Sequence, residues 1–308
     1  MQPVSEAAYR RYEWADPGRH ELVADVDGDG RVEVLFVERP AGFRQSGTVL
    51  LCFDENGAIR WRFAFGRERR VGARVFPKAY DGYLIGATQH GEQRYVVAHA
   101  TQLPYFPDQV VLLDPKDGGL LDEYWHPGHF YAAKLFDLKG DGREELLLGG
   151  VNNPDDAIGH ASLAVLTIPF GGEGSGDTPN YFGNPGGQEI EYILFPRPSL
   201  FDATKRLPGS FGIAAWPSDL LQVEVGIPSS KIIYTFNHEL TLKDVRPSDD
   251  LLRTHYKLFQ EGKLQELAAE ERDAWKHLLR FNTAPDTDTP EIVAMFKEAQ
   301  IKPGEGFH

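Results

Sequence analysis

The segment DVDGDGRVE, from Asp25 to Glu33, carries four acidic side chains in nine residues. In a tight turn, carboxylates at positions 1, 3 and 5 are directed toward one point, and glycines permit the sharp bend. Calcium prefers six to eight oxygen ligands, so this spacing predicts a Ca²⁺ site. The expected ligands are the side chains of Asp25, Asp27, Asp29 and Glu33 and the main-chain carbonyl of Arg31.

The twelfth position of this loop excludes an EF-hand. An EF-hand places a bidentate glutamate there, whereas this chain has Phe36 inside the apolar run VEVLFVE. The remaining acid, Glu33, stands at position 9, which suits a loop between two β-strands.

A second copy of the loop, DLKGDGREE, runs from Asp137 to Glu145. Asp137, Asp141 and Glu145 are its candidate ligands, and they form a weaker set. Lys139 stands where a ligand oxygen belongs, and its ammonium group would replace the ion with an internal salt bridge.

Imperfect copies of this pattern recur along the chain. AYDGYLIGAT, with Asp81 and Gly82, reads as a shortened version midway between the two acidic loops. QVEV at 222–225 parallels RVEV at 31–34, without the acidic loop. Repetition at this spacing indicates one structural unit used about four times.

Short apolar runs bounded by Gly, Pro, Asp or Asn fill the chain up to about residue 245, which is the pattern of β-strands. VLLCFDENGAIRWRF reads as a hairpin with an Asn-Gly turn, and VVLLDPKDGGLLDEYW repeats it. We therefore predict an all-β fold, a β-propeller of about four or five four-stranded blades. A non-repetitive β-sandwich is the alternative. EIEYILF, after a Gly-rich insert at 169–188, is interpreted as part of a fifth, incomplete blade.

The DxDGDGxxE loop before a strand, recurring at blade spacing, resembles the FG-GAP or VCBS repeats of integrin-alpha-like β-propellers. The resemblance implies calcium as a structural brace on one face, a protein or glycan ligand, and an extracellular or periplasmic location. The segments FDENGAIRWRF and LDPKDGGLLDEYW also resemble the outer strand pairs of quinoprotein-type propellers.

The last sixty or so residues change to helical spacing. Ser248 is the expected N-cap and Gly262 the stop of a first helix. The apolar face expected after it consists of Leu264, Leu267, Ala268, Trp275, Leu278 and Leu279. TPEIVAMFKEAQ (289–300) predicts another helix, with Pro290 at its first position. The expected domains are a β-propeller at 1–247 and a helical extension at 248–308, packed on the propeller or binding a partner.

Composition narrows the class of partner. The net charge is −14, which argues against nucleic acid and anionic membranes, because both attract basic surfaces. No apolar run reaches the roughly 20 residues of a membrane span, and the first residues lack the apolar core of a signal peptide. The one cysteine, Cys52, is expected to be a buried apolar residue.

No residue set specifies catalysis. His126 and His129, in YWHPGH, are expected to be loop histidines, since Pro127 and Gly128 exclude a helix that would align them on a metal. The leading hypothesis is a calcium-braced binding module, with an enzyme less favoured. The enzymatic alternatives are a glycan hydrolase or lyase, or a quinone-dependent oxidoreductase, with a site at the central channel. A sensor domain cut from a longer protein is a third hypothesis.

Overall fold

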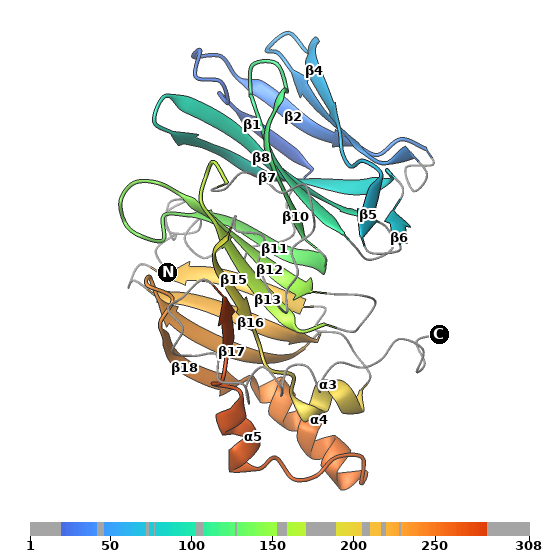
Figure 1. The fold of residues 1–308 in the computed structure, drawn as a ribbon, viewed down its shortest axis with the longest axis vertical. Coiled ribbons are helices and arrows are strands. Elements are labelled where there is room, and N and C mark those ends of the chain that lie inside the picture. Colours follow the sequence, from blue (N-terminus) through green and yellow to red (C-terminus); the bar gives the residue numbers. More distant parts are fainter. Residues whose placement is uncertain are drawn as a thin grey trace, which may run out of the picture.

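The computed structural model describes residues 20–41, 46–71, 74–76, 78–102, 107–126, 128–152, 159–170, 189–204, 210–216, 220–227 and 229–281. Most of them form four antiparallel sheets, each built around four strands that follow one another along the chain (Figure 1). This order is that of propeller blades. The prediction of an all-β fold with four-stranded blades is therefore confirmed, and the described blades number four.

The four blades have the following bounds. Blade 1 contains β1 (Glu21–Ala24), β2 (Glu33–Glu38), β3 (Val49–Phe53) and β4 (Ile59–Ala64). Blade 2 contains β7 (Tyr80–His90), β8 (Gln93–Gln102), β9 (Asp108–Leu113) and β10 (Leu120–His126). Blade 3 contains β11 (Gly128–Phe136), β12 (Glu145–Asn152), β13 (Ala161–Leu166) and β14 (Glu189–Leu194). Blade 4 contains β15 (Ser210–Trp216), β16 (Leu220–Ile227), β17 (Ser230–Asn237) and β18 (Leu242–Pro247). A small hairpin, β5 (Arg69–Val71) and β6 (Arg74–Phe76), lies between blades 1 and 2.

Side-chain alternation explains how the first blade packs. In β2, Glu33, Leu35 and Val37 are buried and the residues between them are exposed. Alternate residues of a strand point to opposite faces of its sheet. Leu35 therefore joins the core shared with blade 2, while Val34 and Phe36 lie on an exposed face.

Three hydrophobic cores lie between the four consecutive blades. Cys52 and Val111 belong to the core between blades 1 and 2, and Leu112 and Leu148 to the next. The third core, which includes Leu163 and Tyr234, joins blades 3 and 4 and extends to the C-terminal helices. The extensive contacts between described strands of different blades all connect consecutive blades, and Figure 1 shows blade 1 and the helices at opposite ends of the molecule.

Two expectations about the repeat were wrong. β14, which contains EIEYIL, pairs with β13 and completes blade 3, so it does not begin a fifth blade. Asp81 lies near the start of β7 rather than in the loop after it, so it is not equivalent to Asp25. The loop of blade 2 that corresponds to the acidic loops is the tight turn at Gly91 and Glu92. Apolar periodicity identified the strand but did not fix which of its ends matched the acidic loop.

The C-terminal region combines helices with a strand. α4 (Asp249–Gln260) begins where the Leu251 amide donates to Ser248 Oγ (3.2 Å), and it ends before Gly262, which has a φ of +69°. Both predicted boundaries of this helix are confirmed. The next helix, α5 (Ala269–Ala274), is short, and α3 (Ser199–Ala203) precedes blade 4.

Leu279, expected on a helical face, lies instead in β19 (Leu279–Phe281). This strand pairs with β14 as the fifth strand of blade 3. Apolar residues at helical spacing over a short segment do not exclude a strand, because the segment can pair with the edge strand of a sheet far away in the sequence.

The helix expected at 289–300 and nearly all of the Gly-rich insert lie outside the described residues. The division into two domains at residue 248 stays a prediction. Among the described helices, none has the length and apolar character needed to cross a membrane.

Candidate functional site

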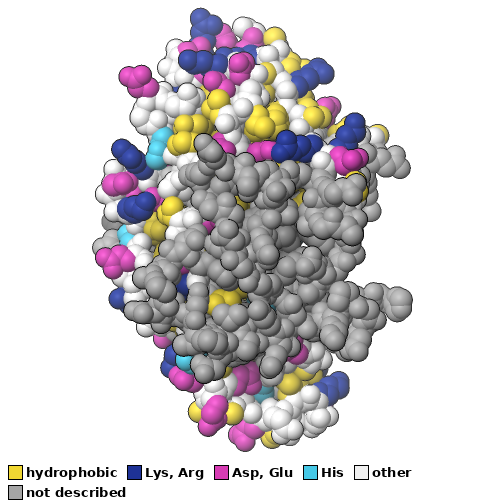
Figure 2. Space-filling model, viewed as in Figure 1, with side chains coloured by type: hydrophobic (Ala, Val, Ile, Leu, Met, Phe, Trp, Pro, Cys, Tyr) yellow, Lys and Arg dark blue, Asp and Glu magenta, His cyan; other side chains and the backbone are white. Residues whose placement is uncertain are grey.

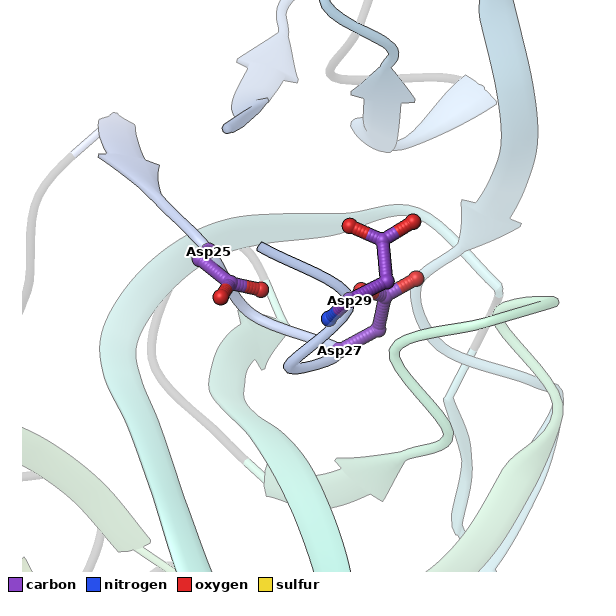
Figure 3. A group of neighbouring side chains, drawn as sticks. All are labelled: Asp25, Asp27 and Asp29. Atoms are coloured by element: carbon purple, nitrogen blue, oxygen red, sulfur yellow. The ribbon is translucent and has the colours of Figure 1, made fainter. Parts of the chain in front are cut away.

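The first acidic loop connects β1 to β2 and gathers three carboxylates. Oxygen atoms of Asp25, Asp27 and Asp29 lie within 4.8 Å of one another, and Figure 3 shows the three side chains on this one loop. Among the described residues, this is the one group of three or more potential metal ligands. The sequence prediction that these three side chains converge is thus matched by the geometry.

The loop's own backbone orients the carboxylates. Gly28 N and Gly30 N donate to the two oxygens of Asp25, at 2.7 and 3.1 Å. Both glycines have positive φ, +81° and +86°, a conformation that side chains disfavour. Asp29 N donates to Asp27 Oδ1 (3.1 Å), and Arg31 N donates to Asp29 Oδ1 (2.8 Å). These bonds fix the turn and point the carboxylates before any ion binds.

Glu33 has a different environment. Its side chain is 1% exposed, and Val26 N donates to its Oε2 at 3.0 Å. Arg60, from β4, donates to Glu33 Oε1 at 2.9 Å and to Asp27 Oδ2 at 2.7 Å. Glu33 therefore acts as an anchor for Arg60 and for the loop backbone. Its assignment as a metal ligand, like that of the Arg31 carbonyl, stays a prediction.

Sequence reasoning missed Arg60 because it lies on β4, which is separated from β2 by β3 in the sheet. The alternation in IRWRFA, with Trp61 buried, signals only that Arg60 is on the opposite face from the core. Burial raises the pKa of Asp27, but the hydrogen bonds from Arg60 and the Asp29 amide outweigh this effect and lower it overall. Asp27 is therefore held as a carboxylate in the protein.

The second acidic loop connects β11 to β12, and its backbone hydrogen bonds largely correspond to those of the first loop. Asp141 N and Gly142 N donate to the two oxygens of Asp137, at 3.1 and 2.9 Å. Leu138 N donates to Glu145 at 3.0 Å, as Val26 N does to Glu33. The repeat relation between the two loops therefore extends to individual hydrogen bonds.

The two loops differ in the source of their positive charge. Lys139 Nζ lies 3.2 Å from Glu145 Oε1, which is the internal salt bridge that the sequence suggested. In the first loop the cation comes from β4, and the position of Lys139 is occupied by Asp27. Metal binding by Asp137, Asp141 and Glu145 stays a prediction. Glu145, the buried acid of this set, already pairs with Lys139.

A buried polar cluster between blades 2 and 3 was not predicted. Asp108, at the start of β9, is fully buried and accepts from Phe130 N at 2.6 Å. Thr101 donates to Asp108 and lies 2.9 Å from His129 Nδ1. His99 Nδ1 is 4.0 Å from Asp108. Burial raises the pKa of Asp108 well above the ordinary range, although its two hydrogen bonds oppose the shift. Asp108 thus joins strands of two blades through one carboxyl group.

The sequence held only a weak signal for this cluster. Asp108 follows a Pro-rich segment and precedes the strand QVVLL, which reads as an ordinary strand boundary. Its partners come from β8 and β11, and sequence spacing alone does not bring those strands together.

His126 and His129 lie in strands rather than in a loop, so that expectation was wrong. His126 ends β10 and His129 lies in β11, on either side of Pro127. His126 Nε2 lies 3.0 Å from the Tyr192 hydroxyl, and the His126 ring stacks on Phe130 with centroids 4.2 Å apart. The two histidines therefore face different partners.

The free energy of unfolding should depend on pH through the protonation of His126. Burial lowers its pKa from 6.5 to about 3, so below pH 6.5 the unfolded chain binds a proton that the folded chain rejects. Stability is then complete above pH 6.5 and falls toward pH 3, by about 1.4 kcal/mol per pH unit for each such proton. We expect His126→Gln to flatten this slope in urea unfolding measured from pH 7 to 3, including the part between pH 4 and pH 3.

His129→Gln is the matched control for this experiment. Burial lowers the pKa of His129 to about 4, so its contribution should end at a higher pH than that of His126. A slope that neither variant changes would contradict the burial of neutral imidazoles.

The surroundings of Cys52 and Asp81 indicate structural roles for both residues. Cys52 is fully buried, as expected, and burial raises the pKa of its thiol to about 12. Asp81 is held by Arg39, whose Nε and Nη2 donate to its two oxygens at 2.9 and 3.1 Å, and by the Tyr83 hydroxyl at 3.2 Å. Asp81 therefore joins blades 1 and 2 rather than marking a metal loop.

Comparisons with known proteins show similarity at the level of solved structures. No family model and no curated protein matches the chain. A solved structure described as the Dos1 propeller is 10% identical with a TM-score of 0.46, covering 80% of this chain. The chain spans half the length of that structure (50%). A crystal structure of a putative exported protein from Bacteroides fragilis is 11% identical with a TM-score of 0.27, covering 79% of this chain and 77% of that one.

Proposed function

We propose that the chain is a binding module of the β-propeller type, with Ca²⁺ bracing its first blade. The observation that carries the metal site is the convergence of Asp25, Asp27 and Asp29 within 4.8 Å. The three carboxylates, with the Arg31 carbonyl, offer the hard oxygen ligands that Ca²⁺ prefers. Bound there, the ion would fix the β1–β2 connection and neutralise charge that Arg60 offsets only in part.

The β1–β2 hairpin that the ion would brace also presents apolar side chains. Val23, Val34 and Phe36 are 63%, 36% and 40% exposed, and Figure 2 shows hydrophobic side chains among charged ones at the blade 1 end of the molecule. An apolar surface with a charged rim is typical of protein-binding sites. The resemblance to FG-GAP or VCBS repeats supports the same role, with a protein or glycan ligand and an extracellular or periplasmic location.

Calcium should raise the melting temperature of the wild-type chain. At 100 times the dissociation constant the ion would add about 2.7 kcal/mol, which corresponds to roughly 5 °C for a chain of this size. We expect Asp29→Asn to remove this shift, because it deletes one ligand charge. Asp29 makes no hydrogen bond with Arg60, so this substitution leaves the Arg60 pairs intact. Differential scanning calorimetry with chelator and with millimolar Ca²⁺ measures the shift.

Asp141→Asn is the matched control, since Asp141 holds the same place in the second loop and accepts from Arg143 N as Asp29 accepts from Arg31 N. This variant should keep the full calcium shift. No calcium-dependent shift in the wild type, or an equal loss in both variants, would contradict a site confined to the first loop.

A ligand screen tests the binding role separately. Glycan arrays and a panel of extracellular proteins would be probed with the wild type, with Asp29→Asn and with Phe36→Ser. Calcium-dependent binding that Phe36→Ser abolishes without lowering the melting temperature supports the β1–β2 face. Turnover of a glycan by the wild type would instead favour the enzymatic alternative.

A further inference from the structure

One face of blade 1 has no described blade packed extensively against it. The extensive contacts between blade 1 and other described blades are with β7 of blade 2, and Figure 1 shows blade 1 at one end of the row of blades. Leu35 and Cys52, on the opposite face, belong to the core shared with blade 2. Because alternate residues of a strand point to opposite sides of the sheet, the residues between them form what we call the outer face of blade 1.

The strand register arranges the outer face in rows of side chains. Residues that pair directly across neighbouring strands lie on the same side of a sheet. One such row crosses the four strands through Glu21, Phe36, Leu51 and Arg62. The next row crosses them through Val23, Val34, Phe53 and Ile59. The outer face therefore has an apolar centre, with an acid at the β1 side and a base at the β4 side.

The apolar side chains of the outer face remain accessible. Val23, Phe36 and Ile59 are all exposed. In blade 3, which lies between two blades, the strand that corresponds to β2 is β12, and every residue of β12 is buried. An exposed group of apolar side chains with charges at its rim marks a binding surface.

The two charges of the outer face are placed to pair with another molecule. Glu21 and Arg62 are both exposed, and within the described part of the chain neither forms an ion pair. They are three strand spacings apart, which is ~14 Å at about 4.8 Å per spacing, so they do not neutralise each other. A surface that carries the same row in reverse order would pair both charges.

We propose that the outer face of blade 1 binds the outer face of a second copy of this chain in a two-fold symmetric dimer. A two-fold axis parallel to the strands places each row against itself in reverse order. Glu21 of each copy then faces Arg62 of the partner subunit, and Phe36 faces Leu51 of the partner subunit. An axis across the strands would instead place β1 against β1 and pair neither charge. The binding role proposed for the β1–β2 hairpin, on which this dimer rests, thereby has a defined partner.

The far end of the row of blades does not complement the outer face. In β16 of blade 4, Val223 and Val225 point into the core, so Gln222 and Glu224 lie on the side away from it. Glu224 is paired there with Lys231 at 2.7 Å. Head-to-tail association would bury this ion pair against apolar side chains, which is unfavourable. Two outer faces meet no such cost.

The contact area is small, so the dimer should be weak. Strands of about six residues at ~3.4 Å each, four of them ~4.8 Å apart, present a face of roughly 400 Å². Two such faces bury on the order of 800 Å², below the size of most specific interfaces, and we expect a dissociation constant of about 10 µM. Sedimentation velocity of the full chain from ~1 to ~200 µM measures it. Salt at about 0.15 M screens the net charge of −14 on each copy.

Removing one ring tests the apolar part of the contact. Phe36→Ser should weaken the dimer by about 100-fold or more, because the symmetry removes two phenyl rings from the interface. Tyr256→Ser is the matched control, since Tyr256 is an exposed aromatic residue of α4 at the other end of the molecule. This variant should dimerise as the wild type does.

Reversing single charges tests the arrangement. Glu21→Lys and Arg62→Glu should each weaken self-association by about 10- to 30-fold, because each creates two like-charged contacts per dimer. A mixture of these two variants should regain the wild-type affinity, since both contacts between them again join opposite charges. Glu270→Lys, at an exposed position of α5, makes the same change in net charge as Glu21→Lys and should leave the dimer unaffected.

Several outcomes would overturn the proposal. These are a wild type that stays monomeric at ~200 µM, dimers that Phe36→Ser leaves intact, and a mixture of the two charge variants that does not associate. Asp29→Asn should still dimerise in the presence of chelator, so a failure of the metal site is distinguished from a failure of the dimer. A monomer that binds a glycan or another protein through Phe36 would support the proposed function and contradict the dimer.

Discussion

Replacing Asp108 with alanine should lower the free energy of unfolding by about 3–5 kcal/mol. The substitution leaves the buried Phe130 amide without its acceptor at 2.6 Å and removes one of the two partners of the Thr101 hydroxyl. Each buried polar group left unsatisfied costs about 1–3 kcal/mol, and the lost carboxyl volume adds to this. Chemical unfolding with tryptophan fluorescence measures the loss, because Trp125 lies in the core between blades 1 and 2.

Asp108→Asn is the control that separates hydrogen bonding from charge. The amide carbonyl still accepts from Phe130 N, so the loss at low pH should stay below about 1.5 kcal/mol. Burial raises the pKa of Asp108 above its ordinary value of 3.8, so the folded chain holds a proton that the unfolded chain releases. Wild-type stability therefore falls, relative to the Asn variant, as the pH rises above 3.8. A difference between the two proteins that does not change with pH would show that the carboxyl group is ionised in the fold.

Replacing Arg60 with glutamine should cost the calcium-free protein about 2–3 kcal/mol and strengthen its response to calcium. Glu33 is 1% exposed and would lose its charged partner at 2.9 Å. Hydrogen bonds to charged groups contribute about 1.5–3 kcal/mol, and a buried charge without its partner is unfavourable. Asp27 would at the same time be released from its pair at 2.7 Å. An ion bound at Asp25, Asp27 and Asp29 then meets no competing cation.

Melting temperatures of Arg60→Gln with chelator and with Ca²⁺ test both parts of this prediction. The calcium shift should exceed that of the wild type. Lys139→Gln is the matched variant in the second loop, and it should cost less, since Lys139 is half exposed and, within the described part of the chain, forms an ion pair with Glu145 alone. A calcium shift in Arg60→Gln no larger than in the wild type would mean that Arg60 and the ion do not compete for Asp27.

Much of the architecture could be predicted from local patterns. Hairpins such as VLLCFDENGAIRWRF were identified because strand alternation and turn residues are encoded within a few positions. The two acidic loops were recognised as equivalent for the same reason, and three of their backbone hydrogen bonds correspond, namely those from position 6 to the first aspartate, from position 2 to the glutamate and from position 7 to the aspartate at position 5. The other bond to the first aspartate differs, because it comes from Gly28 N in one loop and from Asp141 N in the other. The cap at Ser248 and the stop at Gly262 are also local signals.

Errors arose where a pattern could be satisfied in two ways. EIEYIL reads as a strand in any blade, and only pairing with β13 places it in blade 3. Asp81 and Gly82 resemble a shortened acidic loop, but the Arg39 side chain from blade 1 fixes Asp81 at the start of β7. Leu279 fitted a helical face until pairing with β14 made it part of a strand.

The sequence by itself determined the repeated strands, the turns between them and the convergence of Asp25, Asp27 and Asp29, because each depends on residues within about ten positions. The tertiary structure alone decided that Arg60 meets those acids and that Asp108 is buried between two blades. Those features depend on contacts between distant segments, and such contacts are selected by the packing of whole blades rather than by any local preference.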